Sequence, residues 1–105
     1  MPPAIEPDYS DITGIDRFLH EPACLAIMAV LSACESADFQ FLLHATHLNK
    51  GNLSAQAIKL EEAGYITVEK GFHGRTPYTL YRLTAEGKNA LAVYREQLKR
   101  TLDHF

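Results

Sequence analysis

The sequence has only two cysteines, which limits both its covalent and its metal-binding chemistry. Cys24 and Cys34 fall ten residues apart on or near one predicted helix, too far apart for a disulfide within the chain. We interpret both as reduced, structural cysteines rather than as redox or metal-binding groups. His44 and His47 stand three apart, but a helix is predicted to end between them, and no Cys-x-x-Cys pair accompanies them. The sequence therefore predicts no metal site and no cofactor.

Long hydrophobic runs are absent too. The longest, residues 23–31, is far too short to span a bilayer, and no charged segment with a cleavage site precedes it. We therefore expect a cytoplasmic protein with no membrane partner.

The chain reads as one domain over residues 11–105, preceded by a flexible tail over residues 1–10 that contains three prolines. Its apolar spacing is typical of a mainly α fold with a small β-hairpin, an α+β arrangement of four helices, two strands and a closing helix. We place these elements at residues 11–19, 23–33, 39–45, 51–63, 65–68, 78–83 and 85–104.

The helix over residues 51–63 is the element around which the rest is organised. Leu53, Ala57, Leu60 and Ala63 recur on one helical face, which predicts burial of that face. The opposite face is small and polar in its N-terminal half and can lie against another molecule. The free amides and the positive dipole end there suit an anion such as a DNA phosphate.

Several side chains in and just before this helix have the chemistry of DNA contacts. Asn52 and Gln56 carry amides that can pair with adenine, and Lys50 and Lys59 suit phosphates. Gln56 lies nearer the core side, so its role is the weakest of these. From this segment we expect contacts by Asn49, Lys50, Asn52, Ser54, Ala55, Gln56, Ile58 and Lys59.

Residues 65–83 predict two strands joined by a turn, because Gly71, Gly74 and Pro77 separate two runs rich in β-formers. Arg75 falls near the tip. A helix followed by a basic-tipped hairpin is the arrangement of a winged helix, in which the helix enters the major groove and the wing contacts the backbone or the minor groove. From the wing we expect DNA contacts by Lys70, His73, Arg75 and Thr76.

Positive charge is scarce overall, since the net charge is -3, and this counts against a nucleic-acid partner. The distribution is uneven. Residues 49–82 hold five basic and three acidic side chains, a local surplus of +2, so the remainder carries -5. The positive part coincides with the proposed DNA-reading segment and implies few phosphate contacts per subunit.

The closing helix has an apolar stripe and no following element to cover it. We therefore predict that it packs against a second copy of the chain in a homodimer. The alternative is that it folds back on the first helix of its own chain. The residues expected at the dimer interface are Ile12, Ile15, Leu91, Tyr94, Leu98, Leu102 and Phe105.

The strings GNLSAQAIKLEEAGYI, GFHGRTPYTLYRLT and LTAEGKNAL resemble the small winged-helix regulators related to the MarR and ArsR families of prokaryotes. The resemblance covers all but the N-terminal tail and implies a dimeric transcriptional regulator, most often a repressor, that binds double-stranded DNA. Such relatives usually carry arginine where Cys24 stands, glycine where His47 stands and Leu-Arg where this chain has Ala57-Ile58. His47 tolerates a left-handed turn better than most residues, and an exposed Ile58 could touch a thymine methyl.

A catalytic site is not indicated, and we expect no enzyme. A nucleophile needs a base and an orienting group within reach, and Ser54, Cys24 and Cys34 lie in segments better explained by packing or DNA contact. No glycine-rich phosphate loop is present, because the glycines at 71 and 74 belong to the hairpin.

The sequence also fits two other functions. Overall acidity and an exposed Ile58 also fit a winged-helix module that binds another protein without sequence-specific DNA binding. A small aromatic or phenolic effector could be held between the winged domain and the dimer helices. Tyr9, Tyr94 and the apolar second helix would line such a space, but core packing explains them at least as well.

Overall fold

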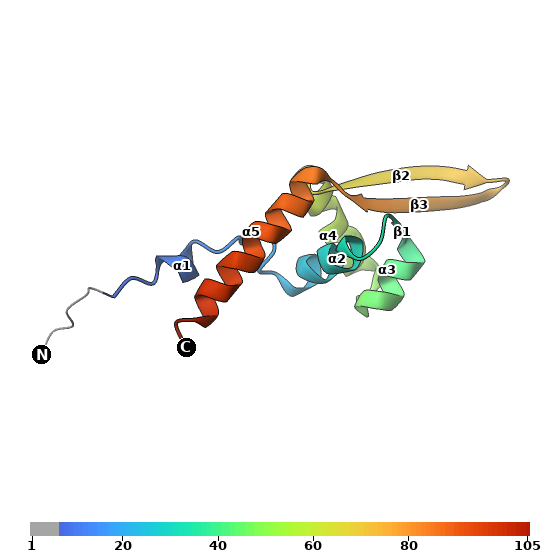
Figure 1. Ribbon diagram of the computed structural model, residues 1–105. Coiled ribbons are helices and arrows are strands. Elements are labelled where there is room, and N and C mark those ends of the chain that lie inside the picture. The colour runs from blue at the N-terminus through green and yellow to red at the C-terminus, as the bar shows by residue number, and fades with distance from the viewer. Residues whose placement is uncertain (1–6) are drawn as a thin grey trace, which may run out of the picture.

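The computed structural model describes residues 7–105, so residues 1–6 of the predicted tail lie outside it. It shows a winged helix made of helices and a small antiparallel sheet (Figure 1), which confirms the predicted fold class. The elements are α1 Ser10–Thr13, α2 Pro22–Ser32, β1 Ala37–Asp38, α3 Phe39–Thr46, α4 Lys50–Glu62, β2 Ile66–His73, β3 Thr76–Leu83 and α5 Ala85–Leu102.

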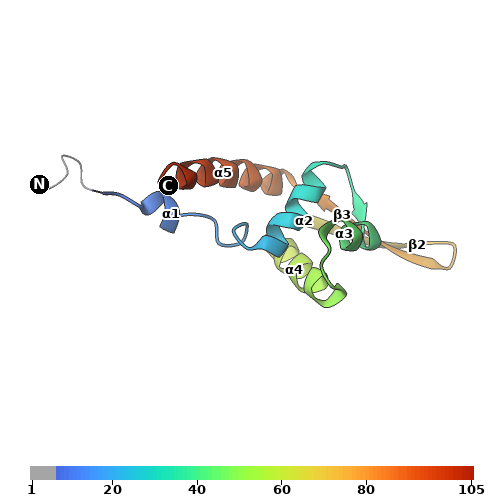
Figure 2. The ribbon, with the colours of Figure 1, turned by 90° about the horizontal axis from the view of Figure 1, so that it is seen from below.

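The sheet has the strand order β1-β3-β2, and all pairs are antiparallel. β2 and β3 form the predicted hairpin, with Ile66 opposite Leu83 at its base and His73 opposite Thr76 at its tip. The hairpin extends well beyond the helices as a long arm (Figures 1 and 2). β1 contributes only two residues beside β3, so the outer part of the arm is held by the pairing of β2 with β3 alone.

The first helix is much shorter than predicted. A helix was expected over residues 11–19, but α1 ends at Thr13. Gly14 weakens helix continuation, and the Asp16 carboxylate accepts hydrogen bonds from the backbone amides of Phe18 and Leu19 at 2.8 and 3.1 Å. These bonds offer the backbone a turn in place of a helix. Leu19, at the end of the predicted helix, is nevertheless fully buried.

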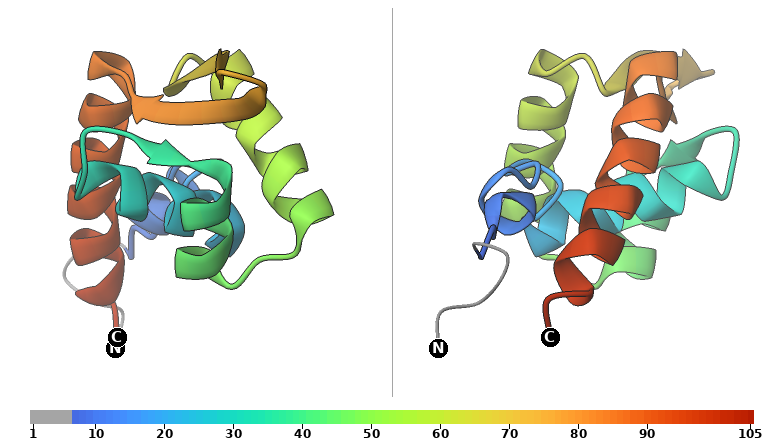
Figure 3. Two further views of the ribbon diagram at one scale, coloured as in Figure 1. Left: turned by 90° about the vertical axis from the view of Figure 1, so that its right-hand side faces the viewer. Right: turned by 60° about the vertical axis from the view of Figure 1, so that its left-hand side comes forward.

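The core is built around α2, whose buried residues Ile27, Met28 and Leu31 meet side chains from every other layer. α4 and α5 lie on opposite sides of α2 and α3, and the hairpin crosses one end of the bundle (Figure 3). The element proposed to read DNA and the element proposed to hold a second subunit are therefore on separate sides of the domain.

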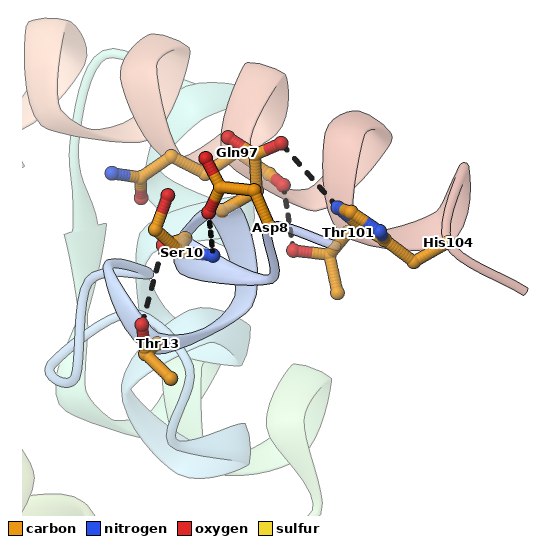
Figure 4. Close-up of polar contacts among 7 residues, drawn as sticks. Asp8, Ser10, Thr13, Gln97, Thr101 and His104 are labelled. Atoms are coloured by element: carbon orange, nitrogen blue, oxygen red, sulfur yellow. Dashed lines mark hydrogen bonds and ion pairs between the residues drawn. The ribbon is translucent and has the colours of Figure 1, made fainter. Parts of the chain in front are cut away.

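The N-terminal segment is fastened along the C-terminal half of α5 (Figure 4). The Asp16 amide donates to the Gln97 side-chain oxygen at 3.0 Å, and the Gln97 amide donates to the Gly14 carbonyl at 3.4 Å. Further along, His104 Nε2 lies 3.4 Å from an Asp11 carboxylate oxygen. The alternative prediction, that the last helix packs on the first segment of its own chain, thus holds for this half of α5.

Candidate nucleic-acid interface

The turn that leads into α4 is fixed by two local devices. His47 ends α3 in the left-handed conformation, with φ 58°, and its amide donates to the Leu43 carbonyl at 3.1 Å. Asn49 then caps α4, and its side-chain oxygen accepts from the Asn52 amide at 2.7 Å. The left-handed turn at His47 is confirmed. Because its oxygen is engaged in capping, Asn49 positions the helix and has only its side-chain nitrogen left for a partner.

The two faces of α4 separate as the spacing predicted. Leu53, Ala57 and Leu60 are buried against the core. The side chains that remain exposed on the other face are Lys50, Ser54, Ala55, Ile58 and Lys59. Ile58 keeps 56% of its surface accessible, which is large for an isoleucine and leaves an apolar group on the exposed face.

Charges along α4 run against its dipole. The first turn contains Lys50 and no acidic residue, whereas Glu61 and Glu62 stand at the C-terminal end. Acidic residues stabilise a helix at its N-terminus and basic residues at its C-terminus, so these three charges oppose helix stability, and only Lys59 in the last turn favours it. The same order leaves the free amides of the first turn beside a cation, which favours an anionic partner there.

The wing has a tight two-residue tip. Gly74 adopts φ +62°, and Arg75 follows it between the paired residues His73 and Thr76. Glycine at the first central position is typical of a type II′ turn, whose twist suits a hairpin. The turn leaves Arg75 exposed at the far end of the arm.

The two faces of the wing differ in whether their polar side chains already have partners within the protomer. On the outer face, Arg82 pairs with Glu69 at 3.4 Å, and the His73 and Tyr78 rings stack with centroids 4.7 Å apart. On the inner face, Val68 and Lys70 share a groove of about 450 Å³ with α4; its other lining residues are Ser54, Ala57, Ile58, Glu61 and Tyr81. Among the residues that the structure describes, no acidic side chain pairs with Lys70.

The structure brings the predicted DNA residues together only in part. Lys70 faces α4 across the groove, and Arg75 lies at the tip of the same arm. His73 and Thr76 lie on the outer face, and the His73 ring packs against Tyr78 there, so neither faces α4 across the groove.

Gln56 is a correction to the predicted set. Its side-chain oxygen accepts from the Cys24 thiol at 3.3 Å, and its amide nitrogen donates to the Asn52 oxygen at 3.1 Å. Both ends of the amide are therefore engaged within the protomer. The helical spacing had placed Gln56 near the core side, but no local pattern could have shown that Cys24 lies opposite it.

Tyr94 is a second correction, this time to the predicted dimer interface. Only 3% of its surface is accessible, and its hydroxyl lies 3.0 Å from His20 Nδ1 within the same protomer. It is a core residue and leaves almost no surface for a second subunit. Leu102 and Phe105, in contrast, keep 58% and 93% of their surface accessible. The remaining expected interface residues, Ile12, Ile15, Leu91 and Leu98, are half-buried.

Cys24 has the character of a packing residue rather than a nucleophile. It is buried, and burial together with the hydrogen bond and charge of Glu21 raises the pKa of its thiol to about 11. Cys34 is also free.

Over residues 7–105, no group of three or more His, Cys, Asp and Glu side chains is arranged to hold a metal ion. Within the same range, no helix combines the length and apolar character that crossing a membrane requires.

The family follows from comparison with known proteins. The model of the winged helix DNA-binding domain family matches residues 24–102, and the chain belongs to this family. An uncharacterised protein of Methanocaldococcus jannaschii is 31% identical over 68 residues, which cover 65% of this chain and 74% of that protein. Membership of this family defines the class of the protein as a DNA-binding regulator.

Solved structures support the same class. A transcriptional regulator homologue from Pyrococcus horikoshii OT3 superposes with a TM-score of 0.83 at 26% identity and covers 90% of this chain and 96% of that one. A PadR family transcriptional regulator from Eggerthella lenta gives 0.67 at 27% identity, over 91% and 90% of the two chains. A MarR family regulator from Silicibacter pomeroyi, an ArsR family regulator and NadR in complex with 4-hydroxyphenylacetate share the fold below 20% identity. The predicted likeness to MarR and ArsR regulators is thus confirmed at the level of the fold, and the predicted winged-helix family is confirmed by the family model.

Proposed function

We propose that the protein is a homodimeric transcriptional regulator, a repressor by analogy with its family, that binds a pseudo-palindromic operator in duplex DNA. The recognition helices α4 of two subunits would enter successive major grooves about 34 Å apart, and the wings would lie beside them. The proposed contacts are Lys50, Asn52, Ser54, Ala55, Ile58, Lys59, Lys70 and Arg75.

One observation supports this proposal most directly. The exposed face of α4 and the inner face of the wing open onto a shared groove, so that one duplex can meet both. Ser54 and Ile58 line the α4 side of this groove, and Lys70 lines the wing side. The wing carries a second cation, Arg75, further out along the same arm. A surface of this shape with unpaired cations suits a groove flanked by phosphates.

Dimer formation is supported by the exposed apolar residues at the C-terminal end of α5. Leu102 and Phe105 are both large and accessible, and Val93 is exposed further along the same helix. Covering these side chains with the same surface of a second copy would remove apolar area from water and relate the two α4 helices by a two-fold axis.

The test uses two arginines of the same hairpin. Arg75→Gln should weaken binding to all duplexes alike and lower the salt dependence of the affinity, because it removes a phosphate contact. Arg82→Gln is the matched control, since Arg82 already pairs with Glu69 on the outer face. Both affinities would be measured over a range of salt concentrations, with duplexes first selected from a random pool and the dimer mass determined in parallel.

Equal behaviour of the two variants would remove the wing from the interface. If the protein instead binds random duplex without the steep loss of affinity that salt causes for electrostatic contacts, the alternative of a protein interaction module is preferred.

A ligand-controlled regulator is a second candidate, favoured by a specific cavity. A groove of about 480 Å³ lies between α2 and α5, with Leu25, Leu91 and Leu98 on its walls and the cations Lys88 and Arg95 beside them. An apolar ring with a carboxylate matches these walls, and NadR, which shares the fold, was solved with 4-hydroxyphenylacetate. Titration of that compound should raise the melting temperature and change the affinity for a selected duplex. Tyr9, expected beside such a ligand, does not line the groove.

A further inference from the structure

Three side chains, those of Cys24, Gln56 and Asn52, form successive hydrogen bonds from the core to the first turn of α4. The Cys24 thiol donates to the Gln56 side-chain oxygen at 3.3 Å, and the Gln56 amide nitrogen donates to the Asn52 side-chain oxygen at 3.1 Å. Cys24 is buried, whereas Gln56 and Asn52 are half-buried, so this series of hydrogen bonds runs from the interior towards the surface.

The buried Cys24 thiol is the first donor in this series of hydrogen bonds. A thiol that keeps its proton is a donor, and Cys24 keeps it at neutral pH because burial and the Glu21 carboxylate raise its pKa to about 11. Glu21 also holds the backbone of Cys24, since its carboxylate accepts from the Cys24 amide at 2.9 Å. Gln56 turns its oxygen towards the thiol and its amide nitrogen towards Asn52, and the Glu21 carboxylate is a second acceptor for the same thiol proton.

The orientation of Gln56 determines which atom of the Asn52 side chain is engaged. Its oxygen is occupied by Gln56, and among residues 7–105 no hydrogen bond involves its side-chain nitrogen. Asn52 stands in the first turn of α4, the part of a recognition helix that contacts base edges. The side-chain nitrogen therefore stays available as a donor, whereas the oxygen is engaged within the protomer.

We propose that Cys24, acting through Gln56, is a positioning residue that makes Asn52 read guanine rather than adenine. Guanine presents two acceptors in the major groove, N7 and O6, which an amide nitrogen can approach together. Adenine presents the acceptor N7 beside the donor N6, and a free asparagine reads both only when its own acceptor is available. The inference rests on the proposed DNA-binding function, and it differs from the expectation that Asn52 pairs with adenine.

Gln56→Glu is the decisive variant. A carboxylate still accepts from the Cys24 thiol but has nothing to donate, so Asn52 must turn its nitrogen inward and its oxygen outward. Arg17 and Lys59 line the hollow beside Cys24 and Gln56 together with Glu21, so the two cations would balance the existing and the added carboxylate. We expect the variant to exchange guanine for a base with an exposed amino group, adenine or cytosine, at one position of each half-site. The change in relative preference should be roughly tenfold.

Cys24→Ser and Cys24→Ala form the matched pair. The serine hydroxyl keeps the donor, so the guanine preference should persist. Alanine removes the donor and frees Gln56 to turn, so discrimination between guanine and adenine should fall several-fold while affinity for random duplex stays the same. Relative affinities would be measured for duplexes that differ at single positions, and urea unfolding would verify that each variant is folded.

The outcomes separate this inference from the proposed function. If the unaltered protein selects no sequence from a random pool, the DNA-reading function itself fails. If it selects a sequence but Gln56→Glu only weakens binding and leaves every base preference unchanged, the positioning role is wrong and the DNA-reading function stands. Equal loss of discrimination in Cys24→Ser and Cys24→Ala would also overturn the role, because it would reflect packing rather than donation.

Discussion

Replacing Lys50 separates the stability of α4 from its proposed contact with DNA. The residue begins the helix, is exposed and stands where a positive charge is unfavourable for the helix dipole. In the proposed complex the same charge lies near a phosphate. The two roles predict effects of opposite sign from one substitution.

The stability effect follows from the charge at the first turn. Removing an unfavourable exposed charge there should raise the free energy of unfolding by about 0.3 kcal/mol for Lys50→Gln, and reversing it should raise it by about 0.6 kcal/mol for Lys50→Glu. The Asn49 cap is unchanged in both variants. Urea unfolding at fixed protein concentration and low salt would measure these gains, and added salt should reduce them.

The binding effect follows from counterion release. Without the Lys50 charge, each subunit neutralises one phosphate fewer and the dimer two fewer, which lowers the slope of log affinity against log salt by about 1.8. At 0.1 M salt this corresponds to about 60-fold weaker binding for Lys50→Gln, and more for Lys50→Glu because the new charge repels phosphate. Fluorescence anisotropy with a selected duplex at several salt concentrations would measure both quantities.

Lys99→Gln is the matched control, since Lys99 is an exposed lysine on α5 that lies 3.5 Å from Glu96 and away from α4. It should leave the salt slope unchanged. The reasoning is refuted if Lys50→Gln keeps the full salt slope, or if both Lys50 variants are less stable than the unaltered protein.

Two further substitutions test backbone geometry by urea unfolding. His47→Gly should raise the free energy of unfolding by about 1 kcal/mol, because His47 adopts φ 58°, which glycine reaches without strain; an unchanged value would mean that the turn stores no strain. Gly87→Ala should lower it by about 1–3 kcal/mol, because an added Cβ would meet the backbone carbonyl oxygen of Tyr65. Gly51→Ala is its control, with the nearest atom 3.7 Å from an added Cβ, and should be neutral or stabilising; equal losses in both variants would contradict the steric explanation.

The sequence predicted the winged helix well because its signals there are local. Helical spacing identified Leu53, Ala57 and Leu60 as the buried face of α4, and the glycines of the hairpin identified the wing. Pro22 begins α2 and Thr84 caps α5, as those residue types indicate. These features depend on neighbours within a few residues, so periodicity and capping rules are sufficient for them.

The misses concern contacts between distant parts of the chain. Tyr94 fits the apolar stripe of α5, but spacing alone cannot show that His20 covers it. Gln56 has the right chemistry for a base contact, and only the fold brings Cys24 against it. β1 exists because Ala37 reaches Tyr81 on β3, a pairing without a local sequence signal. The error at α1 was local, since the turn made by Asp16 competes with a helix that the apolar spacing favoured.

The reach of the wing has a consequence for how this protein can diverge. Beyond β1 the arm lies over no core, and Phe72 near its end keeps 71% of its surface accessible. Substitutions among the last few cross-strand pairs therefore remove little buried area and should hardly change global unfolding. Residues at the tip can therefore change while the helical body retains its stability, so the composition of the arm is nearly independent of folding.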